Sequence, residues 1–393
     1  MRIAYIGQKG IPTKTGGVER YVEEVAVRMA KLGHDVFVYA RNNYTDKKLQ
    51  KYHGVNIIHL PSISTKNLDA ISHTFLATMH ALFQNYDVLH YNSIGPTSLS
   101  FIPKIFSKKL VIISTFQCQD YFHKKWGVFA QAYLRFSEKI TCTVPDKTIT
   151  VNRGLQDYAR DKYKKELAYI PNGANFKFNF GEEQLFSLGI KKDEYIFSAS
   201  RLVRHKGVHY LIEAFNQLCA KNLNAGKKLV IAGDSAFTDD YVSFLKELAK
   251  DNENIIFTGT ISGKKLEQLF SHCFLFVQPS EAEGMSLALL EAMGYGKAIL
   301  ISDIPENLET VHDSCFVFEN KNAKDLENKL LGIIRNPDLA KEAGEKSLAV
   351  AKQFYAWDDV VAQIDKLYKI SSRAKKNQKP SLFSRNWYRL FCK

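Results

Sequence analysis

The sequence predicts an α/β protein with two doubly wound parallel-sheet domains that face a central cleft. The first observation is order: short apolar runs typical of strands alternate with amphipathic helical stretches along the chain, as in parallel sheets. The second is size, because 393 residues are enough for two or three domains. Ligands of such sheets bind beyond the carboxyl ends of the strands, which predicts a site between the domains.

Shifts in composition divide the chain. Residues 174–193 are polar and poor in periodicity, which is typical of a linker. Helical periodicity over 338–371 is interrupted around Phe354 to Asp358. We therefore expect five parts: a first domain at 1–173, the linker at 174–193, a second domain at 194–352, a last helical segment at 353–371 and a basic tail at 372–393.

The strands and helices of both domains are predicted from apolar patterns. The chain begins with a strand at 3–6, a glycine-containing loop, a helix with an apolar stripe from Val18 to Met29, and a strand at 36–40. Such a strand–loop–helix–strand start is typical of a doubly wound sheet. Further strands are expected at 55–60, 87–91, 111–115, 145–152, 195–200, 228–232, 255–257, 273–278 and 298–302.

The composition indicates an ordinary globular protein, since 45% of its residues are apolar and 24% charged. No apolar run approaches the roughly 18 residues that a membrane span needs. We expect the N-terminus, Met-Arg-Ile-Ala-Tyr-Ile-Gly, to form a strand and a turn rather than a signal peptide. The six cysteines include no C-x-x-C pair, which favours the reduced cytosol over disulfides or structural zinc.

The net charge of +13 is unevenly distributed. Residues 1–172 carry 24 basic and 13 acidic side chains, residues 173–371 carry 23 and 28, and residues 372–393 carry seven basic and no acidic ones. A basic half and tail favour an anionic partner, either membrane phospholipid or nucleic acid. The tail also contains aromatic residues, which suits a membrane interface, although a disordered terminus has a similar composition. No DNA-reading or RNA-binding signature is present, so we expect no nucleic-acid partner.

The most informative stretch runs from Pro279 to Gly296. It opens as a loop and becomes helical, with apolar residues at helix spacing at Leu287, Leu290 and Met293. Glu283 therefore lies just before the helix, and Glu291 lies on it eight positions later. Backbone N–H groups at a helix N-terminus can bind an anion, and flanking carboxylates can bind hydroxyl groups. A ligand with phosphate groups between two sets of hydroxyl groups is a nucleotide sugar, so the stretch indicates a site for one.

Two other loops carry features that suit phosphate. Arg201 and Lys206 precede a predicted helix, so positive centres converge as a diphosphate requires, although single basic residues are common in solvated turns. Gly16 and Gly17 open the first predicted helix. That loop has neither the G-x-G-x-x-G nor the Walker pattern, so it is either a tight turn or a phosphate site.

Glu283 and Glu291 resemble the E-x7-E signature of the family-4 retaining glycosyltransferases, which have the GT-B fold of two Rossmann-like domains around a cleft. The spacing of Arg201 and Lys206 is similar to that family's diphosphate clamp. The loop with Gly16 and Gly17 resembles its N-terminal glycine loop, which faces donor and acceptor. The phrase Ile-Pro-Asn-Gly at 170–173 resembles the end of its first domain, and 354–358 its closing segment, where the last helix crosses back to that domain.

The resemblance also implies an acceptor-side loop after the strand at 111–115. Relatives often have His-Gly-x-Asp there, followed by Lys-Trp, and Asp120, Lys125 and Trp126 fit this spacing. The family's histidine position holds Gln117, which can hydrogen-bond but cannot carry a proton near neutral pH. No histidine base is therefore assigned, and His123 is counted only among the acceptor-side candidates.

The resemblance assigns the following roles. Catalytic candidates are Glu283, Lys206 and Arg201; the donor-binding set is Gly16, Gly17, Arg201, Lys206, Gly284, Met285, Ser286, Leu287 and Glu291; and the acceptor side is Gln117, Asp120 and His123. No D-x-D metal motif is evident, so we expect neither metal nor cofactor, only a nucleoside-diphosphate sugar as donor.

We therefore expect a retaining glycosyltransferase of bacterial cell-surface polysaccharide synthesis, similar to the rhamnosyltransferase-like branch. Its acceptor would be a glycan or a polyprenyl-diphosphate-linked glycan. The protein would be cytoplasmic and peripheral on the inner face of the plasma membrane, attached through its basic first domain and tail. Two alternatives stay open: a nucleotide-sugar epimerase of the same fold, and a non-catalytic basic protein that binds membrane or nucleic acid.

One further pattern concerns the helix after the acceptor-side loop. Its aromatic residues recur at helical spacing, at Trp126, Phe129, Tyr133 and Phe136. A stripe of this kind can dock on lipid, but it is more often part of a hydrophobic core. We expect this one to be core.

Overall fold

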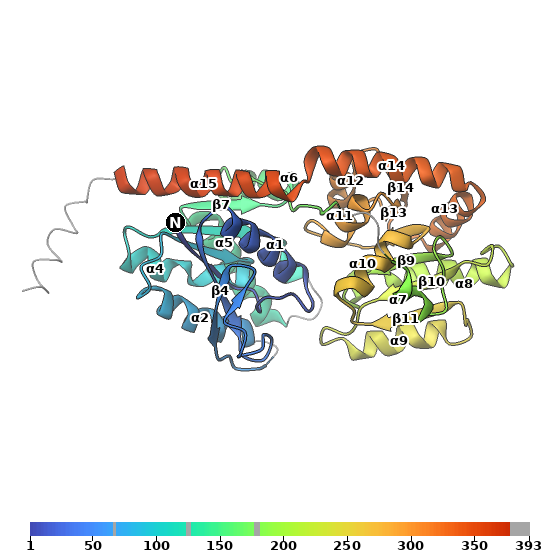
Figure 1. Cartoon of the computed structure of the whole chain (residues 1–393), viewed down its shortest axis with the longest axis horizontal. Coiled ribbons are helices and arrows are strands. Elements are labelled where there is room, and N and C mark those ends of the chain that lie inside the picture. The colour runs from blue at the N-terminus through green and yellow to red at the C-terminus, as the bar shows by residue number, and fades with distance from the viewer. Residues whose placement is uncertain (66–67, 123–126, 177–180, 378–393) are drawn as a thin grey trace, which may run out of the picture.

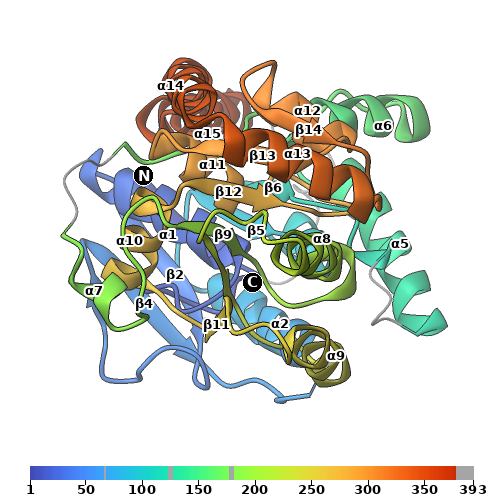
Figure 2. The same ribbon diagram turned by 90° about the vertical axis from the view of Figure 1, so that its right-hand side faces the viewer.

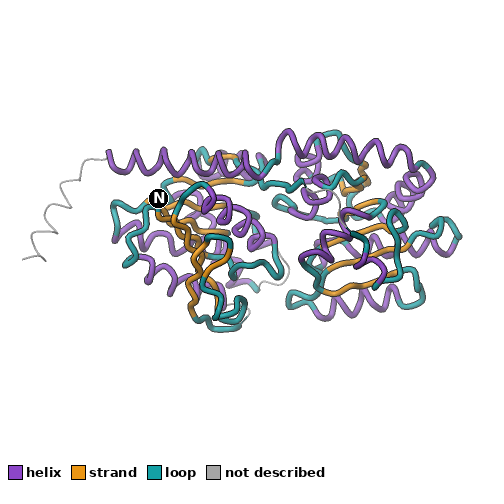
Figure 3. The backbone as a smooth tube through the Cα atoms, viewed as in Figure 1, coloured by secondary structure: helices purple, strands orange, loops and turns teal. Residues whose placement is uncertain are grey.

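The computed structural model describes residues 1–65, 68–122, 127–176 and 181–377, which form two lobes (Figure 1). Each lobe has a central sheet with helices around it (Figure 3). The strand order is β3-β4-β2-β1-β5-β6-β7-β8 in the first lobe and β11-β10-β9-β12-β13-β14 in the second. Neighbouring strands are parallel, apart from the antiparallel pair β3 and β4. The predicted fold class of two parallel-sheet α/β domains is confirmed.

The first domain alternates strands and helices. Its strands are β1 (Arg2–Ile6), β2 (Asp35–Arg41), β3 (Lys51–Tyr52), β4 (Val55–Leu60), β5 (Val88–Asn92), β6 (Val111–Phe116), β7 (Lys147–Thr150) and β8 (Ala168–Tyr169). Its α-helices are α1 (Gly17–Lys31), α2 (Asp69–Ala81), α3 (Ile94–Thr97), α4 (Phe101–Phe106), α5 (Val128–Thr143) and α6 (Arg153–Tyr163). Short 3-10 turns lie at Ser98–Ser100 and Asp120–Phe122.

The second domain repeats this alternation. Its strands are β9 (Tyr195–Ala199), β10 (Lys228–Ala232), β11 (Ile255–Gly259), β12 (Leu275–Gln278), β13 (Ala298–Ser302) and β14 (Phe316–Phe318). Its helices are α7 (Glu183–Phe186), η3 (Arg204–Lys206), α8 (Val208–Ala220), α9 (Asp239–Ala249), α10 (Gly263–His272), α11 (Leu287–Gly294), α12 (Pro305–Val311), α13 (Ala323–Arg335) and α14 (Pro337–Phe354). The last helix, α15 (Trp357–Asn377), follows α14, and these two helices lie at the same edge of the molecule (Figure 2).

The first sheet is buried on both faces, as its β1 strand illustrates. Ile3 and Tyr5 pack with α1 and α15 on one face. Ala4 and Ile6 point the other way and pack with α2. Parallel strands covered on both faces are almost wholly apolar, which is why these runs could be recognised in the sequence.

The last helix differs from its predicted bounds of 353–371. It begins at Trp357 and ends at Asn377, so the first six residues of the predicted tail belong to it. The helix lies across the first domain (Figure 1), where the Tyr368 hydroxyl is buried and lies 2.5 Å from His90 Nδ1. Near its end, Lys375 Nζ lies 2.6 Å from Asp146 Oδ2. The remaining tail, 378–393, lies outside the described residues.

The prediction that the aromatic stripe of α5 is core is wrong. Phe129 is 92% exposed, Phe136 is 59% exposed and Tyr133 is 39% exposed. The helix instead buries a different face, which includes Leu134 and Ile140. Trp126 lies outside the described residues.

Candidate active site

The loop between β12 and α11 is built around the start of the helix. Ser286 caps α11, and its Oγ accepts a hydrogen bond from the Leu289 N–H at 3.3 Å. The same hydroxyl donates to Gln278 Oε1 at 2.6 Å, which ties the cap to the end of β12. The N–H groups of Met285, Ser286 and Leu287 donate no hydrogen bond to any described residue. They are therefore available to an anion.

Glu283 lies in this loop and is paired with Lys206. Glu283 Oε1 is 2.5 Å from Lys206 Nζ and accepts a hydrogen bond from Ser280 Oγ at 2.7 Å. Both side chains are largely buried, at 15% exposed for Lys206 and 8% for Glu283. Because a buried charge needs a partner, this pair is held in place before any ligand binds.

Gly207 allows Lys206 to approach the loop. It has a φ of +66°, and a Cβ at this position would lie 1.8 Å from the Pro279 carbonyl oxygen. The adjacent Glu281 N–H also donates to the His205 carbonyl at 2.7 Å. Any side chain at 207 would push the basic turn away from the loop that carries Glu283.

Arg201 follows β9 and has a different environment. Its side chain is exposed and forms no hydrogen bond or ion pair with the described part of the chain. Burial, and then the neighbouring Asp120 carboxylate, hold the pKa of the Cys118 thiol well above its usual value, whereas the Arg201 and Lys206 charges act to lower it. Both cations thus lie within electrostatic range of the acceptor-side loop.

The glycine loop brings a second helix N-terminus to the same place. Gly16 caps α1 with a φ of +103°, and a Cβ there would lie 2.1 Å from Glu19 Oε2. A Cβ on Gly17 would lie 3.8 Å from Leu287 Cδ1, so the first residues of α1 and α11 lie next to each other where the two domains meet. Two helix N-termini, each with a partial positive charge, therefore converge.

Glu291 lies farther along α11 and reaches the first domain. Its Oε1 is 3.5 Å from Arg20 Nε on α1, and Arg20 Nη2 is also 2.9 Å from Glu24 Oε1. Arg20 was not predicted as a site residue. Its spacing to Glu24 indicates a pair along one helix face, and no sequence signal indicates the contact with Glu291.

The acceptor-side residues follow β6. Gln117 is 8% exposed, and its Nε2 is buried with no hydrogen-bond partner among the described residues. A Cβ on Gly284 would lie 1.9 Å from the Gln117 carbonyl oxygen, so this loop and the Glu283 loop touch through their backbones. Asp120 Oδ1 accepts from Cys118 Sγ at 3.0 Å. His123, like Lys125, lies outside the described residues.

Two asparagines that the sequence reasoning missed join the domains. Asn152 Nδ2 donates to the Gly284 carbonyl at 2.7 Å, and Asn172 Nδ2 donates to the Met285 carbonyl at 3.1 Å. They follow the carboxyl ends of β7 and β8. Their position after parallel strands could have identified them as site candidates, since the other predicted site loops also follow parallel strands.

The structure thus brings most of the predicted residues together at the carboxyl ends of the two sheets. Lys206 pairs with Glu283, the neighbouring Gly284 lies against Gln117, and Gly17 lies near Leu287. The arrangement can bind a diphosphate between cations and helix N-termini, with carboxylates on either side for hydroxyl groups.

Two family models match this chain. The model described as "Glycosyltransferase Family 4" matches residues 15–178, and the one described as "Glycosyl transferases group 1" matches residues 181–350. The chain belongs to the family-4 glycosyltransferases. It is therefore an enzyme of the glycosyltransferase class, and the family resemblance noted from Glu283 and Glu291 is confirmed.

Two curated relatives and one solved structure illustrate the similarity. The O-antigen chain mannosyltransferase B of Escherichia coli is 24% identical over 385 residues, covering 90% of this chain and 96% of that protein. A Campylobacter jejuni N,N'-diacetylbacillosaminyl-diphospho-undecaprenol alpha-1,3-N-acetylgalactosaminyltransferase is 28% identical over 228 residues, covering 53% and 58%. HepE of Anabaena in complex with UDP-glucose has a TM-score of 0.77 at 19% identity, covering 94% and 99%.

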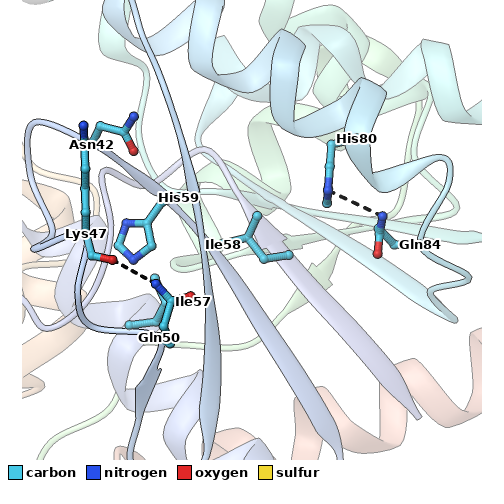
Figure 4. A pocket seen from close by; sticks show the side chains of 8 residues that line it. All are labelled: Asn42, Lys47, Gln50, Ile57, Ile58, His59, His80 and Gln84. Atoms are coloured by element: carbon cyan, nitrogen blue, oxygen red, sulfur yellow. Dashed lines mark hydrogen bonds between the residues drawn. The ribbon is translucent and has the colours of Figure 1, made fainter.

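A separate pocket of about 560 Å³ lies on the first domain of this glycosyltransferase (Figure 4). It is lined by Asn42, Lys47, Gln50, Ile57, Ile58, His59, His80 and Gln84. None of the predicted site residues lines it. The pocket lies beside β4, the second strand of the first sheet, and we assign it no part in binding the donor.

The described residues contain neither a helix that could span a membrane nor a cluster of metal-ligating side chains. Among them, no helix combines the length and the apolar character that crossing a membrane requires. Nor do any three His, Cys, Asp or Glu side chains in the same ranges lie close enough to share a metal ion.

Proposed function

We propose that this glycosyltransferase moves a sugar, with retention of configuration, from a nucleoside-diphosphate sugar to a glycan or lipid-linked glycan in cell-surface polysaccharide synthesis. The observation that carries the proposal is the buried pair of Lys206 and Glu283 at the N-terminus of α11, opposite the N-terminus of α1. It combines a cation and two helix N-termini for a diphosphate with a fixed carboxylate for sugar hydroxyls.

The chemistry in this proposal is the control of charge. When the bond between the anomeric carbon and the diphosphate breaks, negative charge collects on the phosphate oxygens. Arg201, Lys206 and the N–H groups at the start of α11 stabilise that charge, and they supply the positive charge that a metal ion would otherwise provide. We therefore propose a reaction that needs no metal or other cofactor.

The two carboxylates bind opposite ends of the donor. Glu283 holds hydroxyl groups of the sugar beside the carbon that becomes positive. Glu291 binds the ribose hydroxyls, and the donor then takes the place of Arg20 as its partner.

The acceptor hydroxyl attacks the anomeric carbon from the side of the first domain. Gln117 orients this hydroxyl through its unpaired Nε2, but as an amide it takes no proton. The departing phosphate oxygen becomes more basic as the bond breaks, so it accepts the proton of the acceptor. The new glycosidic bond, the free nucleoside diphosphate and the transferred proton balance the reaction.

The proposed acceptor is supported by what the relatives' names say of those proteins. One is named for the O-antigen chain and the other for a diphospho-undecaprenol acceptor. With the basic first domain, these names support a polyprenyl-diphosphate-linked glycan as acceptor and a peripheral place on the cytoplasmic face of the plasma membrane.

A thermal-shift panel of UDP, GDP, dTDP and ADP, each with its sugars, tests the donor. A ligand at about 100 times its dissociation constant stabilises the fold by roughly 2.7 kcal/mol. We expect one base to give this shift and Lys206→Ala to lose it. No shift with any nucleotide would contradict the proposal. A product formed from the donor without acceptor would indicate an epimerase instead.

A further inference from the structure

The outer surface of the first domain exposes many large apolar side chains. Half of the exposed large apolar residues in the described chain lie on α2, α4 and α5 or directly after α2. We define the α4–α5 surface by its apolar members, Phe101, Ile105, Phe106, Val128, Phe129, Tyr133 and Phe136. Helix α5 packs on the turn at Ser98–Ser100, from which α4 continues, and Lys104 of α4 contacts Asp146 just beyond the end of α5, so the two helices are neighbours. Clustered exposure of this kind marks an interaction site rather than chance.

The charges on the α4–α5 surface have one sign. Its exposed cations are Lys104, Lys108, Lys109, Arg135 and Lys139. The stretches 98–109 and 127–143 contain a single acidic residue, Glu138, which is fully buried and accepts hydrogen bonds from Tyr158 and Tyr163. Lys104 pairs with Asp146, which lies outside both stretches. The partner must therefore accept aromatic side chains and offer negative charge.

The geometry points to an anionic phospholipid bilayer as the partner of the α4–α5 surface. Aromatic and aliphatic side chains insert among the acyl chains at a bilayer interface, while lysine and arginine reach the headgroups. Anionic lipids attract each such cation by about 1 kcal/mol near the surface. The complementary charge thus selects an anionic membrane over a neutral one.

The position of α5 relates this surface to the cleft. Val128 and Phe129, the two most exposed of its residues, follow the loop that carries Gln117 and Asp120. Docking would bring the acceptor side of the cleft to the membrane, where a lipid-linked glycan is located. This role in presenting the acceptor rests on the proposed function, whereas the docking itself does not.

The C-terminal tail is a poor alternative occupant. The described chain ends at the edge of this surface, because Lys375 and Lys104 both contact Asp146. Residues 378–393 contain four basic and no acidic residues, so they have the same sign of charge as the surface. Like charges disfavour their pairing, and both segments favour the same anionic lipid.

The test is co-sedimentation of the full chain with vesicles of equal parts phosphatidylglycerol and phosphatidylcholine, and with phosphatidylcholine alone. We expect binding to the first vesicle only, with loss at high salt. Phe129→Ser with Phe136→Ser, and separately Arg135→Glu with Lys139→Glu, should each lower the partition coefficient about tenfold or more. All four positions are exposed, so these variants should fold.

Matched controls use exposed residues of the second domain. Phe186→Ser with Phe237→Ser, and Lys192→Glu with Lys329→Glu, make the same chemical changes elsewhere and should bind vesicles like the wild type. Nucleotide thermal shifts should be unchanged in every variant, so the donor site and the docking surface are tested separately.

Several outcomes would overturn the proposal. The first is that the α4–α5 variants bind the anionic vesicles as tightly as the wild type does. Another is loss of binding on deletion of 378–393 while the α4–α5 variants still bind, because the tail would then be the anchor. A third is that the wild type is a dimer and the phenylalanine variant is a monomer that still binds vesicles equally well. In that case a second copy of the chain would cover the surface.

Discussion

The candidate site has two walls, one from each domain, and they are built differently. On the second domain, Glu283 is held by Lys206 and Ser280, and Ser286 is held by Gln278, which donates in turn to Asn307. On the first domain, the Gln117 Nε2 is buried without a partner among the described residues. On the second domain these buried polar side chains are engaged before any ligand arrives, whereas the first domain keeps a buried hydrogen-bond donor unused.

This difference separates two tasks. A diphosphate and a sugar need charges fixed in advance, because groups that must reorganise during the reaction stabilise a transition state less well. A buried donor without a partner costs free energy, so it suggests a site that a ligand group completes. We infer that the second domain is pre-organised for the donor and that the first domain is completed by the acceptor.

The largest expected effect comes from breaking the pre-organised wall. Lys206→Ala and Glu283→Ala should each lower kcat by about 10²–10³, because each removes one fixed charge from the reacting centre. Steady-state kinetics with the donor identified by thermal shift would measure this. Lys192→Ala is the control, because this exposed lysine precedes β9 and Arg201 follows the other end of that strand. Near-wild-type rates in both variants would refute these roles.

The contact between the walls can be broken by one methyl group. Gly284→Ala would place a Cβ 1.9 Å from the Gln117 carbonyl oxygen, so the two loops must separate. A displacement of about 1 Å can lower the rate on the order of 10²-fold. We expect reduced kcat with retained nucleotide binding. Gly332→Ala on α13 meets no atom within 4 Å and should raise stability by about 1 kcal/mol. Equal activity in both variants would contradict the contact.

Acid should weaken the first domain where α15 docks on it. Burial lowers the pKa of His90 to about 3, and its two ring nitrogens lie 2.5 Å from the Tyr368 hydroxyl and 2.6 Å from Thr115 Oγ1. Between pH 6.5 and about 3 the unfolded chain binds a proton here that the folded chain does not. Stability therefore falls as pH falls through this window, by up to about 1.4 kcal/mol per pH unit.

Urea unfolding at several pH values measures this slope. His90→Gln removes the titrating group and should show a shallower fall, whereas the exposed His53→Gln should behave like the wild type. An unchanged slope in His90→Gln would show that another group causes the acid sensitivity.

The smallest expected effect tests whether the unpaired amide of the first domain binds the acceptor. Gln117→Met replaces the unpaired amide by an apolar group of similar shape, and should stabilise the unliganded protein by about 1 kcal/mol. The same change should raise the KM for the acceptor while leaving that for the donor unchanged. A loss of stability would show that the amide is not an unpaired group.

Much of the fold was predictable because a parallel sheet leaves a strong signal. Strands buried on both faces, such as Ile3 to Ile6, are continuous apolar runs, and the helices between them have apolar stripes. The Glu283 loop was predictable for a related reason: a strand, a glycine and a capped helix are local features.

The cross-domain contacts were not predictable in this way. Arg20 and Glu291 are 271 positions apart in the chain, and each is consistent with an ordinary helix surface. Asn152 and Asn172 donate to backbone carbonyls of the other domain. Every residue has a backbone carbonyl, so the sequence does not indicate which one accepts. Only the packing of the two domains decides these pairs.

By itself, the sequence determined the order of strands and helices, the loops that follow the strands, and the spacing of Glu283, Glu291, Arg201 and Lys206. The tertiary structure decided the environment of each feature. The stripe of Phe129, Tyr133 and Phe136 shows the distinction most clearly, because its spacing predicts a shared face and the expectation of a core was wrong. Helical periodicity states which side chains lie together, but whether they meet protein, solvent or another partner depends on what packs against the helix.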